Sequence, residues 1–472
     1  MDDTNQFVYD FSRKNNIDIN ILFKLFTKIK DIFKNDNYDD ILEENLKTSE
    51  EEQYSNDEVS TPYVLIREIL NHTNDNYFLS NPKILDYCCG KGAIIYNTFI
   101  HYYNILINVI NDPFTCVKNI IEEKLYIGDI NNLNVFITLC LIYHKAIELS
   151  NKEYNYNFNY YIGDAFKLKL YNTWNITSIQ GVFVNPPFHN ENNQGSTQHK
   201  IWINLTLKTF DDWLDNNGLL LQISPESFSS PSSKILNLMK EKNVLQIHFN
   251  QRHHFPEVGS TISWYLIENK NSNNNCLINN NYKLNLSELV YIPQDPCEKS
   301  ISIHEKVMFV DNGKIDMKYD YVTCHNNILL KSTRSNTHSS ISKEKTNTHI
   351  YPVFHTNKQT WYSEIKQDFL DKKKVLFTRS GYTKFIYDDG KYGVTDLGYY
   401  ILVDNKKEGE TLMHNLNSKL INYILSSAKW SGFGNEKVFK LLPNLNKKKF
   451  TDKGLYKYFK LTNEEINHID SN

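Results

Sequence analysis

Cysteine is scarce in this 472-residue sequence, and long hydrophobic runs are missing. The seven cysteines include no C-x-x-C pair, which excludes a disulfide framework or a zinc module and fits a reducing compartment. No run of about 18 apolar residues occurs, so we predict no membrane-spanning segment. The first residues lack the basic-then-apolar layout of a signal peptide, and we therefore expect the protein to act inside the cell. The remaining composition is 40% hydrophobic, 13% aromatic and 23% charged, as in a globular chain.

Charge is unevenly distributed along the chain. The formal net charge of −3 combines acidic residues 1–60, a near-neutral part over 61–275 and a basic part over 276–472. A basic C-terminal part favours contact with nucleic acid, because clustered Lys and Arg neutralise phosphates. A solvated basic surface explains the same charge equally well.

The apolar pattern divides the chain into three parts. Helical spacing over residues 9–34 predicts helices, and the polar, acidic residues 35–60 are typical of a linker. Beyond them, short apolar runs alternate with helical patterns, which predicts a doubly wound α/β domain with a mostly parallel sheet. The runs are Lys83–Tyr87, Lys124–Gly128, Asn159–Gly163, Gly181–Val184, Leu219–Ser224 and Val244–Phe249. The Asn-rich stretch Asn269–Asn281 predicts a boundary, and a mixed α and β pattern follows it.

A glycine loop follows the first apolar run. The loop is Asp86-Tyr87-Cys88-Cys89-Gly90-Lys91-Gly92, and an amphipathic helix comes directly after it. Glycine has no Cβ, so such a loop lets the backbone approach a ligand closely. The G-x-G pattern lacks the third glycine of the dinucleotide fingerprint and the G-K-[ST] of a P-loop. By itself this pattern also fits an ordinary turn.

Carboxylates follow two later runs. Asp129 comes directly after Leu125–Gly128, and Asp164 comes directly after Tyr160–Gly163. The carboxyl ends of parallel strands face one crevice, where one acid can accept both ribose hydroxyls and another an amino group of adenine. Taken singly, each Asp also fits a helix cap.

The most informative segment is Asn185-Pro186-Pro187-Phe188, at the end of the run Gly181–Val184. Two prolines make a rigid turn that presents Asn185 and the carbonyl groups after it. Two such acceptors can hold both hydrogens of an exocyclic NH2 group and free its lone pair for attack. Phe188 offers a face on which a flat base can stack.

Together these segments resemble the gamma class of S-adenosylmethionine-dependent amino-methyltransferases, typically DNA N6-adenine methyltransferases of restriction-modification systems. The resemblance extends from about Ser60 to Lys270 and includes the order of the motifs. Thr61-Pro62-Tyr63-Val64 is similar to the motif that binds the methionine part of the cofactor. Gly218–Pro225 resembles the strand after the catalytic motif, and Phe255–Thr261 resembles the segment whose Phe closes on the flipped base.

The resemblance implies roles for individual residues. Asn185, Pro186 and Phe188 would be catalytic, and the target base would stack between Phe188 and Phe255. The residues implied to bind S-adenosylmethionine are Thr61, Asp86, Cys89, Gly90, Gly92, Asp129, Ile130, Asp164, Asn185 and Pro187. No metal ligand is implied, and His253-His254 lacks a third ligand at matching spacing.

Two features depart from the family pattern. Tyr87 and Lys91 replace the Pro and Ser usual in the loop, and Lys91 adds a positive charge that would weaken binding of a cationic sulfonium. The separation between the loop and Asp129 is also long for a βαβ unit, and an extra helix over Asp112–Lys124 would account for it.

The C-terminal part contains looser matches to the target-recognition region of the same large enzymes. These are Val375–Tyr382, Gly390–Asp396 and Trp430–Phe433, with Arg379 and Lys384 as candidates for phosphate or base contacts. Each of the two cations is equally well explained as an exposed surface residue. Pro296-Cys297 resembles the nucleophile dipeptide of cytosine-C5 methyltransferases, but it lies beyond the cofactor domain.

We therefore predict a doubly wound, Rossmann-like class I methyltransferase domain followed by a mixed α+β target-recognition domain. The predicted division is an acidic helical arm and linker over 1–60, the methyltransferase domain over 61–270 and the DNA-binding domain over 276–472. The expected activity is methylation of adenine N6 in double-stranded DNA, and a separate cognate restriction nuclease is a further candidate partner. An RNA or protein-glutamine methyltransferase with the same turn stays open, as does a non-catalytic nucleic-acid-binding protein with a degenerate cofactor pocket.

Overall fold

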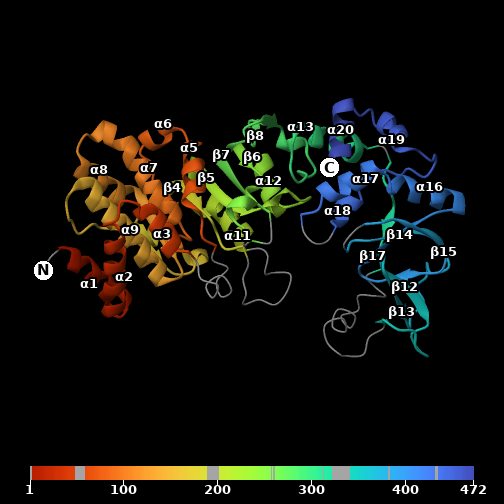
Figure 1. Ribbon diagram of the computed structural model, residues 1–472, viewed down its shortest axis with the longest axis horizontal. Coiled ribbons are helices and arrows are strands. Elements are labelled where there is room, and N and C mark those ends of the chain that lie inside the picture. Colours follow the sequence, from red (N-terminus) through yellow and green to blue (C-terminus); the bar gives the residue numbers. More distant parts are fainter. Residues whose placement is uncertain are drawn as a thin grey trace. The chain divides into compact units, whose positions relative to one another are not determined.

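The computed structural model describes residues 3–47, 59–188, 201–256, 258, 261–311, 313–320, 341–380, 383–430 and 434–472 (Figure 1). The chain forms two compact units. The first consists of Met1–Glu226 and Asn237–Ser287, and the second consists of Ser227–Leu236 and Glu288–Asn472. The division between the units therefore follows Ser287, later than the Asn-rich boundary that the sequence predicts.

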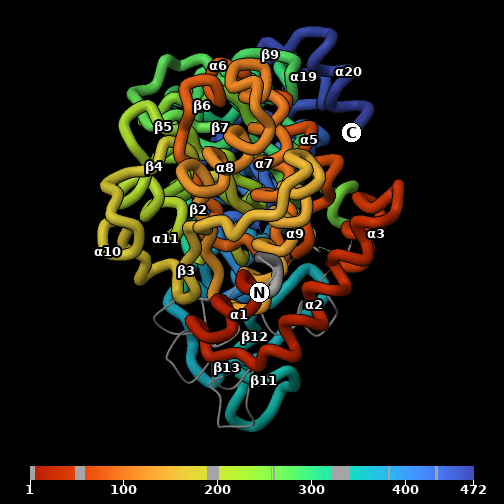
Figure 2. The backbone as a smooth tube through the Cα atoms, turned by 90° about the vertical axis from the view of Figure 1, so that its left-hand side faces the viewer, coloured from red at the N-terminus to blue at the C-terminus, as the bar shows by residue number. Residues whose placement is uncertain are grey.

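The acidic N-terminal part is helical and packs on the first unit. The predicted helices over residues 9–34 are confirmed as part of α1 (Asp3–Asn15) and as α2 (Ile19–Ile32). Their aromatic side chains pack against α9 (Asn132–Ser150), where Phe7 stacks on Tyr143 with ring centroids 5.2 Å apart. Figure 2 shows these first helices beside α9.

A further helix, α3 (Tyr38–Asn45), lies inside the segment predicted to be a linker. The linker prediction is wrong for these residues because Leu42, fully buried, anchors the helix on the first unit. Residues 48–58 lie outside the described part of the chain.

A nine-stranded sheet forms the centre of the first unit, counting the described residues. Its order is β3-β2-β1-β4-β5-β7-β6-β8-β9. The strands are β1 (Ile84–Asp86), β2 (Leu125–Asp129), β3 (Asn159–Ile162), β4 (Ile179–Val184), β5 (Leu214–Pro225), β6 (Lys242–His248), β7 (Ile262–Asn271), β8 (Cys276–Ile278) and β9 (Tyr282–Leu284). The first five are parallel neighbours, and all six predicted runs are strands. β7 is antiparallel to both β5 and β6 and lies between them, although it follows β6 in the chain.

Helices connect the parallel strands, as a doubly wound sheet requires. The connecting helices are α7 (Ala93–Ile110), α8 (Pro113–Asn119), α9, α10 (Leu170–Trp174) and α11 (Ile201–Lys208). α5 (Tyr63–Asn71) and α6 (Asp75–Leu79) precede β1, and α12 (Lys234–Glu241), which begins in the second unit, leads from β5 to β6. α8 and the π-helical turn Ile120–Lys124 confirm the extra helix predicted between the glycine loop and β2.

α9 is apolar almost all round. It is the one helix in the described ranges that is long and apolar enough, by length and composition, to cross a membrane. Its apolar window is 72% buried inside the protein, where α2 packs on it and it packs on β2 and β3. Such burial is typical of a helix in the core of a folded domain.

The Asn-rich stretch belongs to the sheet instead of separating two domains. It begins within the last residues of β7 and contains β8, which pairs in parallel with β6. β9 follows and pairs with β8. Asn274, Asn279 and Asn280 have positive φ angles, which asparagine tolerates better than most residues, so the stretch makes tight turns between short edge strands.

The second unit has the mixed α+β structure that the sequence predicts. Two four-stranded sheets have the orders β10-β17-β14-β15 and β11-β13-β12-β16 within the described ranges. Their strands are β10 (Met317–Lys318), β11 (Ile341–Ser342), β12 (Tyr351–Thr356), β13 (Gln359–Ser363), β14 (Lys373–Thr378), β15 (Ile386–Asp389), β16 (Gly393–Val394) and β17 (Gly398–Leu402). The helices are α13 (Glu298–His304), α16 (Lys406–Leu416), α17 (Lys419–Ser427), α18 (Glu436–Phe439), α19 (Asp452–Tyr458) and α20 (Asn463–Ser471).

A buried ion pair lies in the first of these sheets. The Lys374 ammonium is fully buried and lies 2.9 Å from the Asp388 carboxylate. It also donates to the carbonyl oxygens of Phe369, Leu370 and Lys372 at 2.7–3.0 Å. Burial lowers the pKa of Lys374, and the Asp388 carboxylate opposes that shift. The pair joins β14 and β15 to the turn that precedes them.

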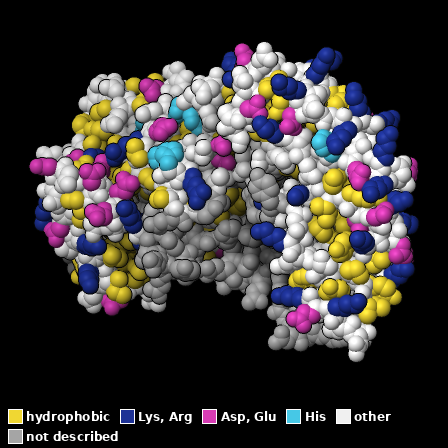
Figure 3. Space-filling model, turned by 45° about the vertical axis from the view of Figure 1, so that its right-hand side comes forward, with side chains coloured by type: hydrophobic (Ala, Val, Ile, Leu, Met, Phe, Trp, Pro, Cys, Tyr) yellow, Lys and Arg dark blue, Asp and Glu magenta, His cyan; other side chains and the backbone are white. Residues whose placement is uncertain are grey.

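Lysines are numerous on the surface of the second unit, and Figure 3 shows many Lys and Arg side chains on its drawn face. The exposed lysines between residues 406 and 460 include Lys406, Lys407, Lys419, Lys437, Lys440, Lys447, Lys448, Lys449, Lys453, Lys457 and Lys460. The basic charge of the C-terminal sequence is thus displayed on the surface of a folded unit.

Candidate functional site

A cavity of about 910 Å³ opens in the first unit at the carboxyl ends of β1 to β4. This volume is within the range of pockets that hold small molecules. The cavity brings together every site residue predicted in this domain except Gly92. These residues are Thr61, Asp86, Cys89, Gly90, Asp129, Ile130, Asp164, Asn185, Pro186, Pro187, Phe188 and Phe255. Their individual roles stay predictions.

The glycine loop lies between β1 and α7. Gly90 and Gly92 have φ angles of 49° and 91°, in the left-handed region that favours glycine. A Cβ on Gly92 would lie 2.8 Å from the Thr138 hydroxyl oxygen of α9. Gly92 therefore contributes close packing of the loop on α9 and does not line the cavity.

Asp86 ends β1 beneath this loop. It is fully buried, and its Oδ1 accepts the backbone N–H of Cys88 at 3.2 Å. Its Oδ2 has no hydrogen-bond partner within the described part of the chain. Burial raises the pKa of Asp86 well above its usual range, and the nearby Asp129 carboxylate raises it further. Burial therefore disfavours the charged form of Asp86 relative to an exposed aspartate.

Asp129 ends β2 and joins the glycine loop to the next turn. One carboxylate oxygen accepts the N–H of Gly90 at 2.9 Å, and the other accepts the N–H of Asn131 at 2.8 Å. Burial raises its pKa, and these two backbone hydrogen bonds partly oppose the shift. Each carboxylate oxygen has a second lone pair, so the acid can still accept ligand hydroxyls.

Apolar side chains flank these acids. Ile130 is 73% exposed and Phe166 is 40% exposed, and both line the cavity. Asp164 lies at the start of the short 3-10 turn that carries Phe166, and its Oδ1 accepts the Phe166 N–H at 2.9 Å. A nucleoside has a flat apolar base, ribose hydroxyls and an amino group. Two apolar side chains beside two carboxylates that can accept these hydroxyl and amino hydrogens suit such a ligand. Phe166 was not predicted as a site residue, because an aromatic residue in a polar turn has no motif of its own.

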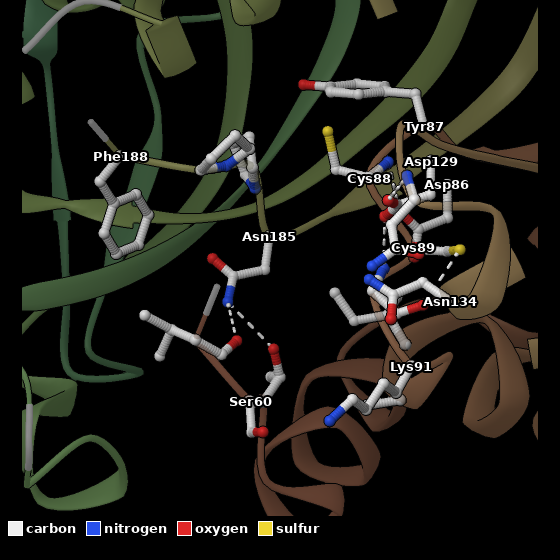
Figure 4. A pocket seen from close by; sticks show the side chains of 18 of the residues that line it. Ser60, Asp86, Tyr87, Cys88, Cys89, Lys91, Asp129, Asn134, Asn185 and Phe188 are labelled. Atoms are coloured by element: carbon white, nitrogen blue, oxygen red, sulfur yellow. Dashed lines mark hydrogen bonds between the residues drawn. The ribbon is translucent and has the colours of Figure 1, made fainter. Parts of the chain in front are cut away.

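Asn185 follows β4 and has a fixed side-chain amide (Figure 4). Its Nδ2 donates to the Thr61 hydroxyl oxygen at 3.0 Å and to the Val59 carbonyl oxygen at 3.5 Å. Its Oδ1 is buried and has no hydrogen-bond partner in the described structure. The amide oxygen is therefore left as an acceptor in the wall of the cavity. Thr61, predicted to contact the cofactor, here holds the amide of Asn185.

Aromatic residues line the cavity next to Asn185. In Figure 4, Phe188 and the glycine loop lie on opposite sides of Asn185. Phe188 is 6% exposed and Phe255 is 3% exposed, and both line the cavity. Of the segment Phe255–Thr261, residues 257, 259 and 260 lie outside the described residues.

The two departures from the family loop fit the structure. Tyr87 is almost fully buried, and its ring packs on Trp213 with ring centroids 5.0 Å apart, so it acts as a core residue. Lys91 lines the cavity, and its ammonium donates to the Lys47 carbonyl oxygen at 3.3 Å. The Lys91 ammonium group therefore lies next to the backbone just after α3.

The C-terminal candidates lie in the second unit. The Arg379 backbone N–H donates to the Leu397 carbonyl oxygen at 3.1 Å, and Lys384 is exposed. Cys297 caps α13, where its sulfur accepts the Ser300 N–H at 3.4 Å. Gly381, Tyr382 and residues 431–433 of the predicted recognition segments lie outside the described residues.

No protein-family model matches this chain, and no curated protein is significantly similar to it in sequence. Its fold resembles a nuclease-deletion mutant of the Type ISP restriction-modification enzyme LlaGI in complex with a DNA substrate mimic. The TM-score is 0.52 at 11% identity, over 82% of this chain and 45% of that chain. The ATP-dependent Type ISP enzyme LlaBIII bound to DNA matches with a TM-score of 0.46 at 11% identity, over 73% of this chain and 33% of that chain.

A modification subunit of a putative type I restriction enzyme from Vibrio vulnificus YJ016 matches with a TM-score of 0.36 at 13% identity, over 48% of each chain. This chain thus spans 33–48% of the length of the three solved structures. At such identities the likeness is one of fold. The predicted fold, a doubly wound Rossmann-like α/β domain with a mixed α+β second part, is confirmed by the strand order and the parallel pairing of β1 to β5.

Proposed function

We propose that this chain is an S-adenosylmethionine-dependent methyltransferase that methylates the exocyclic N6 of adenine in double-stranded DNA. The observation that carries the proposal is the amide of Asn185. Its nitrogen is anchored on Thr61 at 3.0 Å, and its buried oxygen has no hydrogen-bond partner among the described residues. A buried acceptor without a partner is costly unless a ligand satisfies it.

The residues around the cavity fit the proposed cofactor. Ile130 and Phe166 offer apolar faces to its adenine, Asp129 accepts ribose hydroxyls, and Asp164 accepts the adenine amino group. Cys89 and Gly90 bring the backbone of the glycine loop to the same wall. The cofactor supplies an electrophilic methyl group on a sulfonium.

The catalytic turn acts on the attacking nitrogen. Asn185 Oδ1 and the Pro186 carbonyl oxygen accept the two hydrogens of the target NH2 group. This geometry would draw the lone pair out of conjugation with the ring. The N–CH3 bond would form as the S–CH3 bond of the cofactor breaks, with the neutral thioether S-adenosylhomocysteine as the leaving group. The alkylated nitrogen would be acidic and would lose its proton to water, so no general base with a shifted pKa is required beforehand.

Phe188 and Phe255 supply the apolar surfaces for the target base. A base inside a duplex cannot reach a cavity at strand ends, so the adenine must be flipped out of the helix. In this proposal the second unit recognises the DNA sequence, and its exposed lysines contact phosphates. The protein then acts inside the cell, where its target DNA lies, and a separate cognate nuclease is a candidate partner.

The test is to express the full chain in a host without DNA methylation and to sequence the host DNA with modification-sensitive reads. The expected result is methylated adenine within one short motif, with a much smaller methylated fraction when Asn185→Ala replaces the wild type. Transfer of labelled methyl to RNA or to a glutamine side chain, without transfer to DNA, would reassign the substrate. No binding of S-adenosylmethionine at millimolar concentration would indicate a degenerate pocket and refute the proposal.

A further inference from the structure

Helix α3 of the N-terminal arm forms part of the wall of the cofactor cavity. Glu43 of α3 lines the cavity, as do Leu46 and Lys47 just beyond its end, and all three precede the segment that resembles known methyltransferases. Glu43 has no hydrogen bond or ion pair with any described residue. Its neighbour Glu44 is exposed and does not line the cavity.

Polar contacts with three other helices hold α3 in this position. Asp39 accepts hydrogen bonds from Arg67 of α5 at 2.5 Å and from the Tyr96 hydroxyl of α7 at 3.3 Å. The Tyr38 hydroxyl lies 2.5 Å from the Lys145 ammonium of α9. These contacts, together with the burial of Leu42, fix the face of α3 that carries Glu43 against the cavity.

The other walls determine which end of the cofactor reaches α3. The nucleoside fits the ends of β2 and β3, where Asp129 and Asp164 lie beside apolar surfaces, and the methyl group must lie near Asn185. The amino-acid end is then left to the wall formed by residues 60–63, Lys91 and α3. That end carries an ammonium and a carboxylate group.

Resting on the proposed function, we propose that Glu43 binds the ammonium group of the cofactor's amino-acid end and that the arm over residues 3–47 is thereby part of the cofactor site. Among the residues that the structure describes, the other carboxylate on this side of the cavity is Asp86. It is fully buried beneath the loop, and burial raises its pKa, so it is a poor counter-ion for an ammonium group. Glu43 is half-buried and faces the same space, where an ion pair is screened less than on the surface.

The test is titration calorimetry of the full chain with three compounds. S-adenosylmethionine and S-adenosylhomocysteine contain the amino-acid end, and 5′-methylthioadenosine lacks it. Glu43→Gln should weaken binding of the first two about tenfold or more, as expected for a lost hydrogen bond to a charged group. Binding of 5′-methylthioadenosine should stay within about twofold of wild type. Glu44→Gln, one residue away and exposed, is the matched control and should bind all three as wild type does.

A second pair of variants tests the docking of α3. Asp39→Asn removes the charge that Arg67 and Tyr96 bind, and it should weaken the two amino-acid-containing ligands while sparing 5′-methylthioadenosine. Asp40→Asn, exposed on the same helix, should have no effect. Thermal denaturation of each variant shows whether the unit remains folded.

The outcomes separate this inference from the proposed function. Equal affinity of Glu43→Gln and wild type for S-adenosylhomocysteine overturns the role of Glu43 and leaves the methyltransferase proposal intact. A Glu43→Gln variant that loses all three ligands equally also overturns it, because the defect is then not at the amino-acid end. A wild-type chain that binds none of the three compounds overturns both proposals.

Discussion

Replacing Asn185 by Ala tests the chemistry of the catalytic turn. The amide oxygen is buried and no described residue donates a hydrogen bond to it, so no protein donor loses a partner when it is removed. The variant removes the proposed contact with the target amino group, and it also removes the hydrogen bonds that Nδ2 donates to the Thr61 hydroxyl and the Val59 carbonyl oxygens. Removing one positioned hydrogen-bonding group in a dry site costs about 10²–10³ in rate, roughly 2.7–4 kcal/mol of transition-state stabilisation. We expect that loss in the rate of methyl transfer.

The assay is single-turnover transfer of labelled methyl to DNA from a methylation-free host, at saturating cofactor. Cofactor affinity, measured separately, should stay within about threefold of wild type, because Asp129, Asp164 and the glycine loop are untouched. Thr61→Val is a graded comparison: it removes the acceptor that orients the Asn185 amide and should slow transfer less than Asn185→Ala does. A rate for Asn185→Ala within a few-fold of wild type would refute the proposed mechanism.

Three further predictions concern the fold. Gly92→Ala would place a Cβ 2.8 Å from the Thr138 hydroxyl oxygen at a φ of 91°, and it should lower the free energy of unfolding by about 1–3 kcal/mol, measured by urea denaturation. Lys374→Met leaves the buried Asp388 carboxylate without its cation and should lower the free energy of unfolding of the second unit by about 3–5 kcal/mol. Adding Asp388→Leu should recover part of this loss. If it recovers none, the loss does not come from the unpaired carboxylate. Burial lowers the pKa of His304 to about 3, so the unfolded state binds the extra proton below its own pKa of about 6.5. The free energy of unfolding should therefore be unaffected by His304 above pH 6.5 and should fall by up to about 1.4 kcal/mol per pH unit as the pH is lowered toward 3. His304→Asn should remove this part of the pH dependence.

Much of the first unit could be predicted because its strands end in residues with strong local preferences. Asp86 before two glycines, Asp129 after an apolar run and Asn185 before two prolines each mark the carboxyl end of a strand. Since neighbouring parallel strands place these ends at one edge, the cavity follows from the order of the motifs. The confirmed strands and the common cavity depend on these local signals.

What could not be predicted depends on contacts between distant parts of the chain. α3 is acidic enough to look like a linker, and only the burial of Leu42 and the contacts of Asp39 explain why it folds on the first unit. The Asn-rich stretch looks like a boundary, but β8 gains its stability by pairing with β6. The contact between Thr61 and Asn185 joins residues 124 positions apart, and no local pattern reports it.

The position of β7 between β5 and β6 has a consequence for how the chain folds as it is synthesised. β5 emerges from the ribosome first, and its free edge has no partner until residues 262–271 follow, because β6 pairs with β7 and not with β5. During that interval two apolar strands present unpaired backbone groups to other nascent chains. We expect aggregation of newly made protein to be most sensitive to the rate of translation between β5 and β7, and a chaperone that shields this edge to improve the yield of folded protein.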